Sequence, residues 1–446
     1  MKLTFDRGTI LIRGNTRVPN STWDERSKSF RAMAFHYRDI IDFLELSGFD
    51  FKDNVLNFMP SPELKSSITL RSYQKQAIDA WIASGKRGVI VLPTGSGKTI
   101  IGIKAISLQN TPTIVVAPTL DLVDQWRSRL EEEFNVEVGV LGGGEREIKA
   151  LTVSTYDSAY IHADRLGNRF GLIIFDEVHH LPAAGYRNIA EMFASPFRMG
   201  LTATFEREDG LHTELNRLVG GKVFEMMVKD LTGLYLSPFR LEKIAVELTE
   251  DEKREYAINQ KIFSNYLLRS NLAIRNPLDF QKLVMRSGRD PQARQALLAR
   301  NKARDIAFNS ISKIEKLSEI LKRHSDGKAF IFTEHNKLVH SISKKFLIPS
   351  ITYRTTGKER NEILNRFRSG IYKAVVTSKV LDEGIDVPDA DVGIILSGTG
   401  SERAFVQRLG RILRKKAGKE AVLYEIVSAK TSETNTASKR KRPLRQ

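Results

Sequence analysis

The residues most able to do chemistry in this chain form one short loop, Leu92-Pro-Thr-Gly-Ser-Gly-Lys-Thr99. An apolar run, Gly88 to Leu92, precedes the loop, and a helix-like pattern, Ile100 to Ile106, follows it. A strand, a glycine-rich turn and a helix N-terminus in this order can cradle phosphates through backbone N–H groups. Lys98 would reach the β- and γ-phosphates, and Thr99 would hold Mg²⁺. We expect the nucleotide-binding residues of the loop to be Pro93, Thr94, Gly95, Ser96, Gly97, Lys98 and Thr99.

A pair of carboxylates supplies the second part of the predicted site. Asp176 and Glu177 follow another apolar run, Gly171 to Phe175, at the place where a strand would end. There, Asp176 can bind Mg²⁺ and Glu177 can polarise an attacking water. Alone, the pair would read as the solvated end of a strand. Together with the loop, in which Leu92 replaces the glycine of the strict pattern, it predicts hydrolysis of a nucleoside triphosphate.

Arginines near the C-terminus could complete this site. In the segment Gln407-Arg-Leu-Gly-Arg-Ile-Leu-Arg414, helical spacing brings Gln407, Arg411 and Arg414 near one face. Two arginines on one face can hold the γ-phosphate of a nucleotide bound by a neighbouring lobe. A basic DNA-binding face is the simpler reading of this segment alone. Its position after Asp382 to Pro388 favours the phosphate role.

Composition limits the class of protein. The chain has 446 residues, 41% of them hydrophobic, which suits about two to four domains. No apolar run approaches the roughly 18 residues of a membrane span, and the N-terminus lacks the apolar core of a signal peptide. We therefore expect a soluble, cytoplasmic protein without a membrane partner. Because there is no cysteine, disulfides, thiolate zinc sites and cysteine nucleophiles are excluded.

The charge balance points to a polyanionic partner. Lys and Arg number 70 against 53 Asp and Glu, which gives a net charge of +17. A nucleotide site needs only a few cations, and a generally charged surface would not need so large a surplus. The excess therefore favours nucleic acid as the partner.

The elements that must position these residues fall into blocks. Residues 1–62 combine a hairpin around Arg7-Gly8 with a helix, Tyr37 to Leu46, as a small α+β domain. Residues 65–235 and 305–428 each alternate strand-like and helical runs, which predicts two parallel α/β lobes with functional residues at the strand C-termini. We expect strands at Gly88–Leu92, Thr113–Ala117, Ala150–Ser154, Gly171–Phe175 and Met199–Thr202, and at Ala329–Thr333, Ile351–Tyr353, Ala374–Thr377, Gly393–Leu396 and Ala421–Ile426.

Two further blocks lack this rhythm. Residues 236–303 are charged and helical, with no β-like run, and are interpreted as an inserted helical element. Residues 429–446 are polar and basic, and are interpreted as a disordered tail. Trp81 and Trp126 lie in helical patterns and are assigned to the core. His179-His180 has no third ligand at zinc spacing, so we expect no metal there.

Across nearly the whole chain, these segments resemble, in order, the motifs of superfamily 2 helicases. The matching segments are Arg71-Ser-Tyr-Gln74 (the adenine-reading motif), Leu92 to Thr99 (motif I), Ala117 to Trp126 (motif Ia), Ser154-Thr-Tyr-Asp157 (a strand-contacting segment), Asp176 to His179 (motif II), Leu201-Thr-Ala-Thr204 (motif III), Phe330 to His335 (motif IV), Thr377 to Pro388 (motif V) and Gln407 to Arg414 (motif VI). A closer resemblance is to archaeal XPB-type helicases. It rests on Arg207-Glu-Asp209, just past motif III where that family carries this motif, and on Leu92 and Asp176 to Pro182.

This resemblance implies an architecture and an activity. The lobes would be RecA-like, residues 1–62 a damage-recognition domain, and residues 236–303 a helical thumb in the first lobe. The protein would be a DNA-stimulated ATPase that uses ATP and Mg²⁺, moves 3′-to-5′ and opens duplex DNA. Its DNA would be single-stranded or forked. The implied setting is nucleotide excision repair beside a structure-specific endonuclease, or transcription, with the protein itself a monomer.

The resemblance also implies roles for single residues. Gln74 and Arg71 would read adenine, while Gly384 and Asp386 would contact the nucleotide, with Asp386 at the ribose. Arg411 and Arg414 would be arginine fingers beside Gln407. The residues implied to contact DNA, or to couple it to ATP, are Thr119, Thr155, His179, Thr202, Thr204, Arg207, Glu208, Asp209 and Thr377. His179 could instead only hydrogen-bond motif VI.

Three other functions stay open. A double-strand translocase would use the same ATP motifs without separating strands. An RNA helicase is disfavoured by the Asp-Glu-Val-His form of motif II and by Arg207-Glu-Asp209. A DNA scaffold with a relic ATP fold is disfavoured because Lys98, Glu177 and Arg414 are intact.

Overall fold

The computed structural model describes residues 1–14, 16–207, 209–227, 230, 239–274, 277–378, 390–396 and 421–434. The chain divides into two compact units, one covering Met1–Leu231 and the other covering Thr232–Asp382 and Asp386–Gln446. Each unit is described by itself. In the described part of the chain, no helix is both long enough and apolar enough to cross a membrane.

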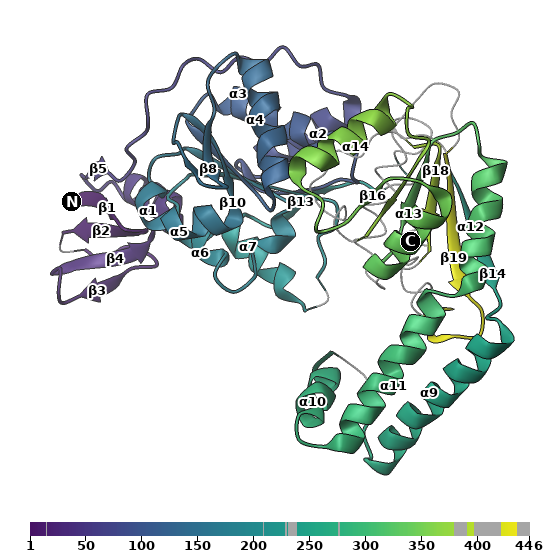
Figure 1. Cartoon of the computed structure of the whole chain (residues 1–446). Helices are drawn as coiled ribbons and strands as arrows, with labels where there is room; N and C mark the ends of the chain where they lie inside the picture. The colour runs from purple at the N-terminus through teal and green to yellow at the C-terminus, as the bar shows by residue number, and fades with distance from the viewer. Residues whose placement is uncertain are drawn as a thin grey trace. The chain divides into compact units, whose positions relative to one another are not determined.

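The N-terminal domain is a small mixed sheet with one helix packed on it (Figure 1). Its sheet order is β3-β4-β2-β1-β5, built from β1 Lys2–Asp6, β2 Thr9–Arg13, β3 Thr22–Asp24, β4 Ser29–Met33 and β5 Lys52–Asn54, with helix α1 at Tyr37–Leu46. The predicted hairpin and helix are confirmed. The hairpin turns at Arg7 and Gly8, whose φ angles are +44° and +82°, the handedness that two-residue hairpin loops favour.

This domain packs against the first α/β lobe through Phe35 and the turn at Gly8. Arg87 Nη2 donates to the Phe35 carbonyl at 3.1 Å, and the Arg217 guanidinium lies 5.2 Å from the Phe35 ring centre. A methyl group on Gly8 would lie 2.5 Å from Met192 Cγ, so only glycine lets the hairpin approach so closely. The domain and lobe are therefore joined by close packing as well as by the chain.

Arg198, at the edge of this contact, is completely buried. Its guanidinium donates to four backbone carbonyls, those of Ala190, Phe193, Ser195 and Leu218. Burial lowers the pKa of Arg198 well below its usual value. Since buried cations need such partners, the carbonyls compensate for the lost hydration, and Arg198 ties residues 190–195 to Leu218.

The first lobe is an eight-stranded sheet of order β13-β6-β12-β11-β7-β10-β8-β9, parallel except at the β8–β9 hairpin. Its strands are β6 Arg87–Val91, β7 Thr113–Ala117, β8 Gly139–Gly142, β9 Glu145–Arg146, β10 Leu151–Thr155, β11 Leu172–Asp176, β12 Phe197–Thr202 and β13 Lys222–Glu225. Its helices are α2 Ser72–Ala83, α3 Lys98–Gln109, α4 Leu120–Phe134, α5 Tyr156–Leu166, α6 Arg187–Met192 and α7 Glu214–Leu218. The five predicted strands are confirmed, because buried parallel strands read as continuous Val- and Ile-rich runs.

The second lobe is a wholly parallel six-stranded sheet of order β14-β19-β18-β15-β17-β16. Its strands are β14 Phe239–Val246, β15 Ala329–Phe332, β16 Ser350–Ile351, β17 Ala374–Thr377, β18 Val392–Ile395 and β19 Ala421–Ser428, with helices α12 Ile311–Arg323, α13 Asn336–Phe346 and α14 Gly357–Arg368. Four of the five strands predicted here are confirmed, whereas the predicted strand Ile351–Tyr353 shares only Ile351 with β16. Together the two sheets confirm the α/β fold class.

The expectation that residues 236–303 contain no strand is wrong. Strand β14, Phe239–Val246, pairs in parallel with β19 along its whole length. Helices α9 Glu250–Arg269, α10 Pro277–Ser287 and α11 Pro291–Phe308 follow it and lead into α12 (Figure 1). The helical insertion thus belongs to the second unit, not to the first lobe as the resemblance implied. The pattern hid the strand because Glu242 and Lys243 interrupt it, as an edge strand allows.

The predicted start of the tail at residue 429 is also too early. Thr431 and Glu433 are buried in the second lobe, where the Lys313 ammonium donates to both Glu433 carboxylate oxygens at 2.6 and 2.7 Å. Composition misplaces this boundary because a glutamate in a polar stretch normally lies in water. Residues 435–446 of the predicted tail lie outside the described residues.

Candidate active site

The glycine-rich loop joins β6 to α3 and has the backbone shape of a phosphate cradle. Gly95 and Gly97 have φ angles of +83° and +82°, and α3 begins at Lys98. This turn directs the free N–H groups of the helix N-terminus to one place. Lys98 Nζ donates to the Leu92 carbonyl at 3.2 Å. Leu92 therefore contributes a backbone oxygen to the loop while its side chain fills the core, so glycine is not required there.

Helix α2 fastens the outer side of this loop. Gln74 Nε2 and the Tyr73 hydroxyl both donate to the Ser96 carbonyl, at 3.0 and 2.5 Å. The other end of the Gln74 amide accepts from Arg71 N at 3.0 Å and caps the helix. A Cβ on Gly97 would lie 2.6 Å from Gln74 Nε2, so the amide packs directly on the loop. Adenine reading by Gln74 and Arg71 stays a prediction.

The two carboxylates lie at the C-terminal end of β11, as predicted. Asp176 is buried, and its Oδ2 accepts from the Trp126 indole N–H at 2.8 Å. Glu177 has a φ of +48°, an unfavourable conformation for a side chain of this kind, typical of functional sites. Its Oε1 lies 4.0 Å from Lys98 Nζ. Burial, reinforced by the Glu177 charge, raises the pKa of Asp176 to about 6.

These residues fit a Mg²⁺-nucleotide. A divalent cation would relieve the burial and mutual repulsion of Asp176 and Glu177, and phosphates would complement Lys98 and the N–H groups of the loop. Thr94 Oγ1 is buried and has no hydrogen-bond partner among the described residues, so the loop contains a polar atom that a ligand can satisfy. Thr99 lies in the first turn of α3, where the predicted metal contact requires it.

A buried histidine links motif II to motif III. His179 Nδ1 lies 3.0 Å from Thr202 Oγ1 and 3.4 Å from Glu177 Oε2. Thr202 Oγ1 in turn donates to the Thr204 carbonyl at 2.9 Å. The Glu177 carboxylate is therefore connected, through His179, to the end of the neighbouring strand β12. Within the described part of the chain, no cluster of three or more His, Cys, Asp or Glu side chains is arranged around a metal position.

Arg207 extends this network. Its guanidinium forms two hydrogen bonds to Asp209, at 2.9 and 2.6 Å, and a third to the His179 carbonyl. The Arg207 hydrogen bond holds the pKa of Asp209 well below its usual value. The Arg-Glu-Asp segment thus contacts motif II directly. Glu208 lies outside the described residues.

Two threonines predicted to contact DNA are helix N-caps. Thr119 Oγ1 accepts from Leu122 N at 3.3 Å and caps α4, and Thr155 Oγ1 accepts from Ser158 N at 3.2 Å and caps α5. The strands that precede them, β7 and β10, are paired neighbours. Two helix N-termini therefore open at the same sheet edge, where their dipoles favour an anion such as a DNA phosphate.

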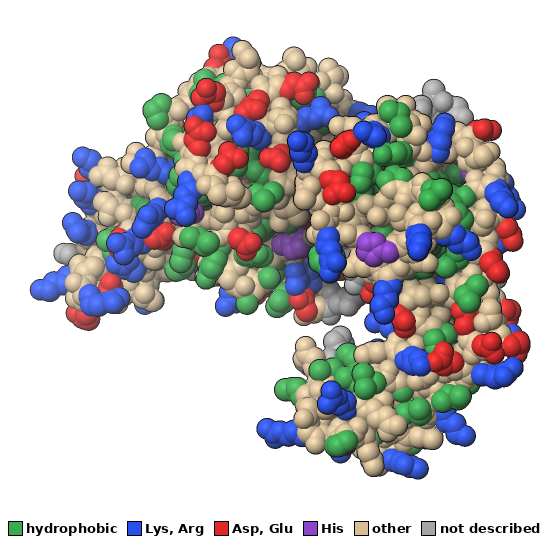
Figure 2. Space-filling model, in the orientation of Figure 1, with side chains coloured by type: hydrophobic (Ala, Val, Ile, Leu, Met, Phe, Trp, Pro, Cys, Tyr) green, Lys and Arg blue, Asp and Glu red, His purple; other side chains and the backbone are tan. Residues whose placement is uncertain are grey.

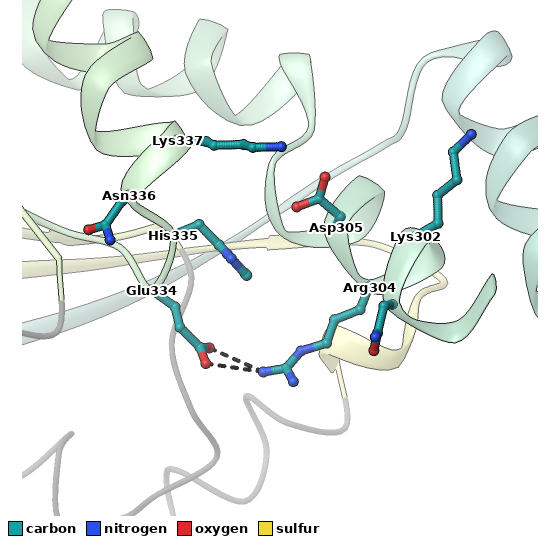
Figure 3. A pocket seen from close by; sticks show the side chains of 8 residues that line it. Lys302, Arg304, Asp305, Glu334, His335, Asn336 and Lys337 are labelled. Carbon is teal, nitrogen blue, oxygen red and sulfur yellow. Dashed lines mark hydrogen bonds and ion pairs between the residues drawn. The ribbon is translucent and has the colours of Figure 1, made fainter. Parts of the chain in front are cut away.

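In the second unit, motif IV borders a cavity of about 590 Å³ (Figure 3). Its lining residues come from α11 and from the β15–α13 junction: Asn301, Lys302, Arg304, Asp305, Glu334, His335, Asn336 and Lys337. Arg304 Nη2 donates to both Glu334 oxygens, at 3.2 and 3.3 Å, across this cavity. The inserted helices are thereby connected to motif IV.

The remaining predicted site residues belong to the C-terminal part of the chain, and only Thr377 among them is described. Thr377 is at the end of β17, where its buried hydroxyl donates to the Ser378 carbonyl at 3.0 Å. The other predicted nucleotide contacts, Gly384, Asp386, Gln407, Arg411 and Arg414, lie outside the described residues, and their roles stay predictions.

Sequence reasoning missed the part that Trp126 plays. Its assignment to the core is correct, since only 1% of the residue is exposed, yet its one polar atom is bonded to Asp176. Tyr156 was missed in the same way, because its hydroxyl donates to the Asp176 carbonyl at 3.1 Å. A sequence signal exists in hindsight for both aromatic residues, because a buried indole or phenol needs a hydrogen-bond partner.

Comparisons with known proteins agree with this geometry. Residues 3–55 match the xeroderma pigmentosum group B helicase damage recognition domain, residues 67–207 the res subunit of type III restriction enzymes, and residues 312–416 the helicase conserved C-terminal domain. The chain is 45% identical to the DNA 3′-5′ translocase XPB2 of Sulfurisphaera tokodaii, over 98% of this chain and 99% of that protein. It is 31% identical to the DNA 3′-5′ helicase XPB of Mycobacterium tuberculosis, over 84% of this chain and 63% of that protein.

Two solved structures have a similar fold. The Pyrococcus furiosus Hef helicase domain superposes with a TM-score of 0.54 at 20% identity, over 84% of this chain and 98% of that chain. Saccharomyces cerevisiae Dbp5 bound to RNA and ADP–BeF3 gives a TM-score of 0.58 at 15% identity, over 85% and 88%. At these identities the likeness establishes the fold alone. The near full-length sequence identity and the damage recognition domain establish more: the chain belongs to the XPB family of superfamily 2 helicases.

Proposed function

We propose that this protein is an ATP-driven DNA helicase that moves 3′-to-5′ and opens duplex DNA in nucleotide excision repair or transcription. The observation that carries the proposal is that Lys98 and Glu177 lie 4.0 Å apart at the end of a sheet whose strands β7 and β10 lead into the capped helices α4 and α5. An ATP site and an anion-binding edge thus share one lobe.

Each residue of the ATP site has a distinct proposed role. The glycine-rich loop and Lys98 hold the phosphates, and Glu177 orients the attacking water and accepts its proton. Mg²⁺ would be held by Thr99 and Asp176 and would screen the phosphate charge. Gln407, Arg411 and Arg414 would stabilise the transferring phosphate, with Gly384 and Asp386 at the nucleotide.

The proposed link from ATP to DNA runs through His179. Since His179 contacts both Glu177 and Thr202, a change at the γ-phosphate can alter the end of β12. The same residue is held by Arg207 through its carbonyl, so the Arg-Glu-Asp segment moves with motif II. Thr119 and Thr155 would hold phosphates of the tracked strand.

The N-terminal domain is the proposed second DNA contact. Lys and Arg side chains gather over it on the face shown in Figure 2. Its exposed basic residues include Lys2, Arg7, Arg13, Arg17, Arg26 and Lys28. Trp23, on β3, is 48% exposed, which suits stacking on an unpaired base. Contacts of this kind would be strong on distorted DNA and largely independent of sequence.

A second candidate is a double-strand translocase that never separates strands. The Sulfurisphaera tokodaii relative, which is named a DNA 3′-5′ translocase, favours this candidate. In either role we propose that the protein works where chromosomal DNA is found, in the cytoplasm or nucleoid. We further propose that it is a monomer on its own and acts beside a structure-specific endonuclease.

The test is the steady-state ATPase rate with no nucleic acid, single-stranded DNA, forked DNA and RNA, together with fork unwinding. We expect strong stimulation by DNA, its loss in Glu177→Gln, and retained ATPase but lost unwinding in Arg207→Ala. Arg129→Ala, an exposed arginine on α4, is the matched control and should behave as wild type.

The alternatives give different results. ATPase and duplex translocation without any unwinding would support the translocase. Preferential stimulation by RNA, or a rate that survives Glu177→Gln, would contradict the proposal.

A further inference from the structure

Trp126, the last residue of the segment that resembles motif Ia, bonds to the side chain of the predicted metal ligand Asp176. Its indole N–H donates to Asp176 Oδ2 at 2.8 Å. Asp176 Oδ1 accepts from Glu177 N at 3.0 Å. Each carboxylate oxygen therefore has a fixed donor, and the plane of the Asp176 carboxylate is set by one side chain and one backbone group.

The Trp126 ring has little freedom to leave this position. A Cβ on Gly102, in the loop's own helix α3, would lie 2.6 Å from Trp126 Cη2 and 3.5 Å from Leu201 Cδ1. The ring is thus packed against α3, beside the strand that carries motif III. Because Trp126 is buried and interiors are close-packed, rotating the indole would displace one of these neighbours.

Trp126 is also joined, through helix α4, to the sheet edge that carries the nucleotide loop, because strands β6 and β7 run parallel and both end at that edge. It lies seven residues after Thr119, the N-cap of α4, which corresponds to about 10 Å along a continuous helix. A shift of α4 would therefore be carried to the indole N–H without a flexible connection. Thr119 is one of the residues proposed to hold a DNA phosphate.

We propose that Trp126 is a positioning residue that orients the Asp176 carboxylate for Mg²⁺ and makes metal affinity depend on the position of helix α4. The inference rests on the proposed function in that the ligand is a Mg²⁺-nucleotide. Outer partners of metal ligands commonly change metal affinity or activity by 10–100-fold, roughly, when they are removed.

The chain provides a matched control. Trp81 is also fully buried, and its indole N–H donates to the Arg198 carbonyl at 2.9 Å, away from the nucleotide site. Trp81→Phe and Trp126→Phe each remove one buried indole N–H and keep an aromatic ring. An effect of general destabilisation would appear in both variants, whereas a positioning effect would appear in Trp126→Phe alone.

The first measurement follows the indole N–H resonances of the full chain, which has three tryptophans. The three signals are assigned by replacing Trp23, Trp81 and Trp126 with phenylalanine in turn. Titration with Mg²⁺ and ADP should shift the Trp126 signal and leave the Trp81 signal in place. A Trp126 signal that ignores Mg²⁺ while ADP binds would overturn the inference.

The second measurement is the Mg²⁺ concentration at half-maximal ATPase, with and without single-stranded DNA. Trp126→Phe should raise this concentration by about 10-fold, leave metal-free ADP affinity near wild type, and lose any effect of DNA on the Mg²⁺ requirement. Trp81→Phe should keep the wild-type values.

The positioning role of Trp126 and the proposed function can be contradicted separately. An unchanged Mg²⁺ requirement in Trp126→Phe, beside a working wild-type ATPase, would overturn the positioning role alone. A wild-type protein with neither ATPase nor Mg²⁺-ADP binding would overturn the proposed function itself.

Discussion

The two lobes each place a lysine beside a glutamate, and the two lysines have different surroundings. In the first lobe, Lys98 donates to one carbonyl at 3.2 Å and lies 4.0 Å from the Glu177 carboxylate. In the second lobe, Lys313 is completely buried and donates to both oxygens of Glu433, to the Leu396 carbonyl at 2.8 Å and to the Phe308 carbonyl at 3.4 Å. One ammonium has room for a ligand, and the other has its donors in use.

The difference separates a lysine that binds from a lysine that holds the fold together. An ammonium group has three donors, so Lys98 retains capacity for phosphate oxygens while Lys313 joins α12 to the ends of β18 and β19. Both sheets are largely parallel. Among the described residues, however, only the first lobe has a glycine-rich loop, which follows strand β6. The chemistry therefore depends on loop residues rather than on the sheet.

The largest expected effect is on Lys98. Lys98→Ala should lower the ATPase rate by about 10²–10³-fold, as removal of one preorganised donor to developing charge does. The melting temperature should stay close to that of wild type, because Lys98 has few internal partners. Steady-state ATPase and thermal denaturation of the same preparation check both parts. A large loss of stability would mean that Lys98 is structural after all.

Lys313 should show the reverse. Lys313→Met leaves the buried Glu433 carboxylate without its cation, which should cost about 3–5 kcal/mol of unfolding free energy. The double variant Lys313→Met/Glu433→Leu should recover most of that loss, because it removes both charges. Chemical denaturation measures the two variants. Equal stability of Lys313→Met and wild type would contradict the structural role.

A smaller effect is expected where α3 meets Trp126. Gly102→Ala places a methyl group against the indole and should cost about 1–3 kcal/mol of stability, as overpacking does. In the Trp126→Phe background the shorter ring should accommodate the methyl, so the same substitution should cost less there. A double-mutant cycle gives the coupling energy. Simple additivity would show that the two residues do not share this space.

The smallest effect is expected for Arg304 and Glu334. This pair is partly exposed, so its loss in Arg304→Ala should change stability by only about 0.2–1 kcal/mol, far less than loss of Lys313. Raising the salt concentration should reduce the difference from wild type further. Chemical denaturation at low and high salt measures this stability difference. A loss of unfolding free energy as large as that of Lys313→Met would contradict the expectation that the partly exposed pair contributes less than the buried pair.

The two lobes could be predicted from sequence because their signals are local. Val- and Ile-rich runs such as Thr113–Ala117 and Ala374–Thr377 were placed at the strand bounds that the structure has. The wrong assignments are in places where a local signal is misleading. Strand β14 contains Glu242 and Lys243, so its composition wrongly assigns it to the helical insertion. Glu433 lies in a polar stretch, so composition wrongly assigns it to the disordered tail, although it is buried.

The sequence by itself determined the chemical inventory of the site: the glycine-rich loop with Lys98, the carboxylates Asp176 and Glu177, and the order of the motifs around them. Short-range spacing and residue type are sufficient for these. Only the tertiary structure decided that Trp126 bonds to Asp176, 50 residues away, and that Lys313 meets Glu433, 120 residues away. Such partners follow from how helices pack on a sheet, because a buried polar group bonds to whatever donor or acceptor the fold brings within reach.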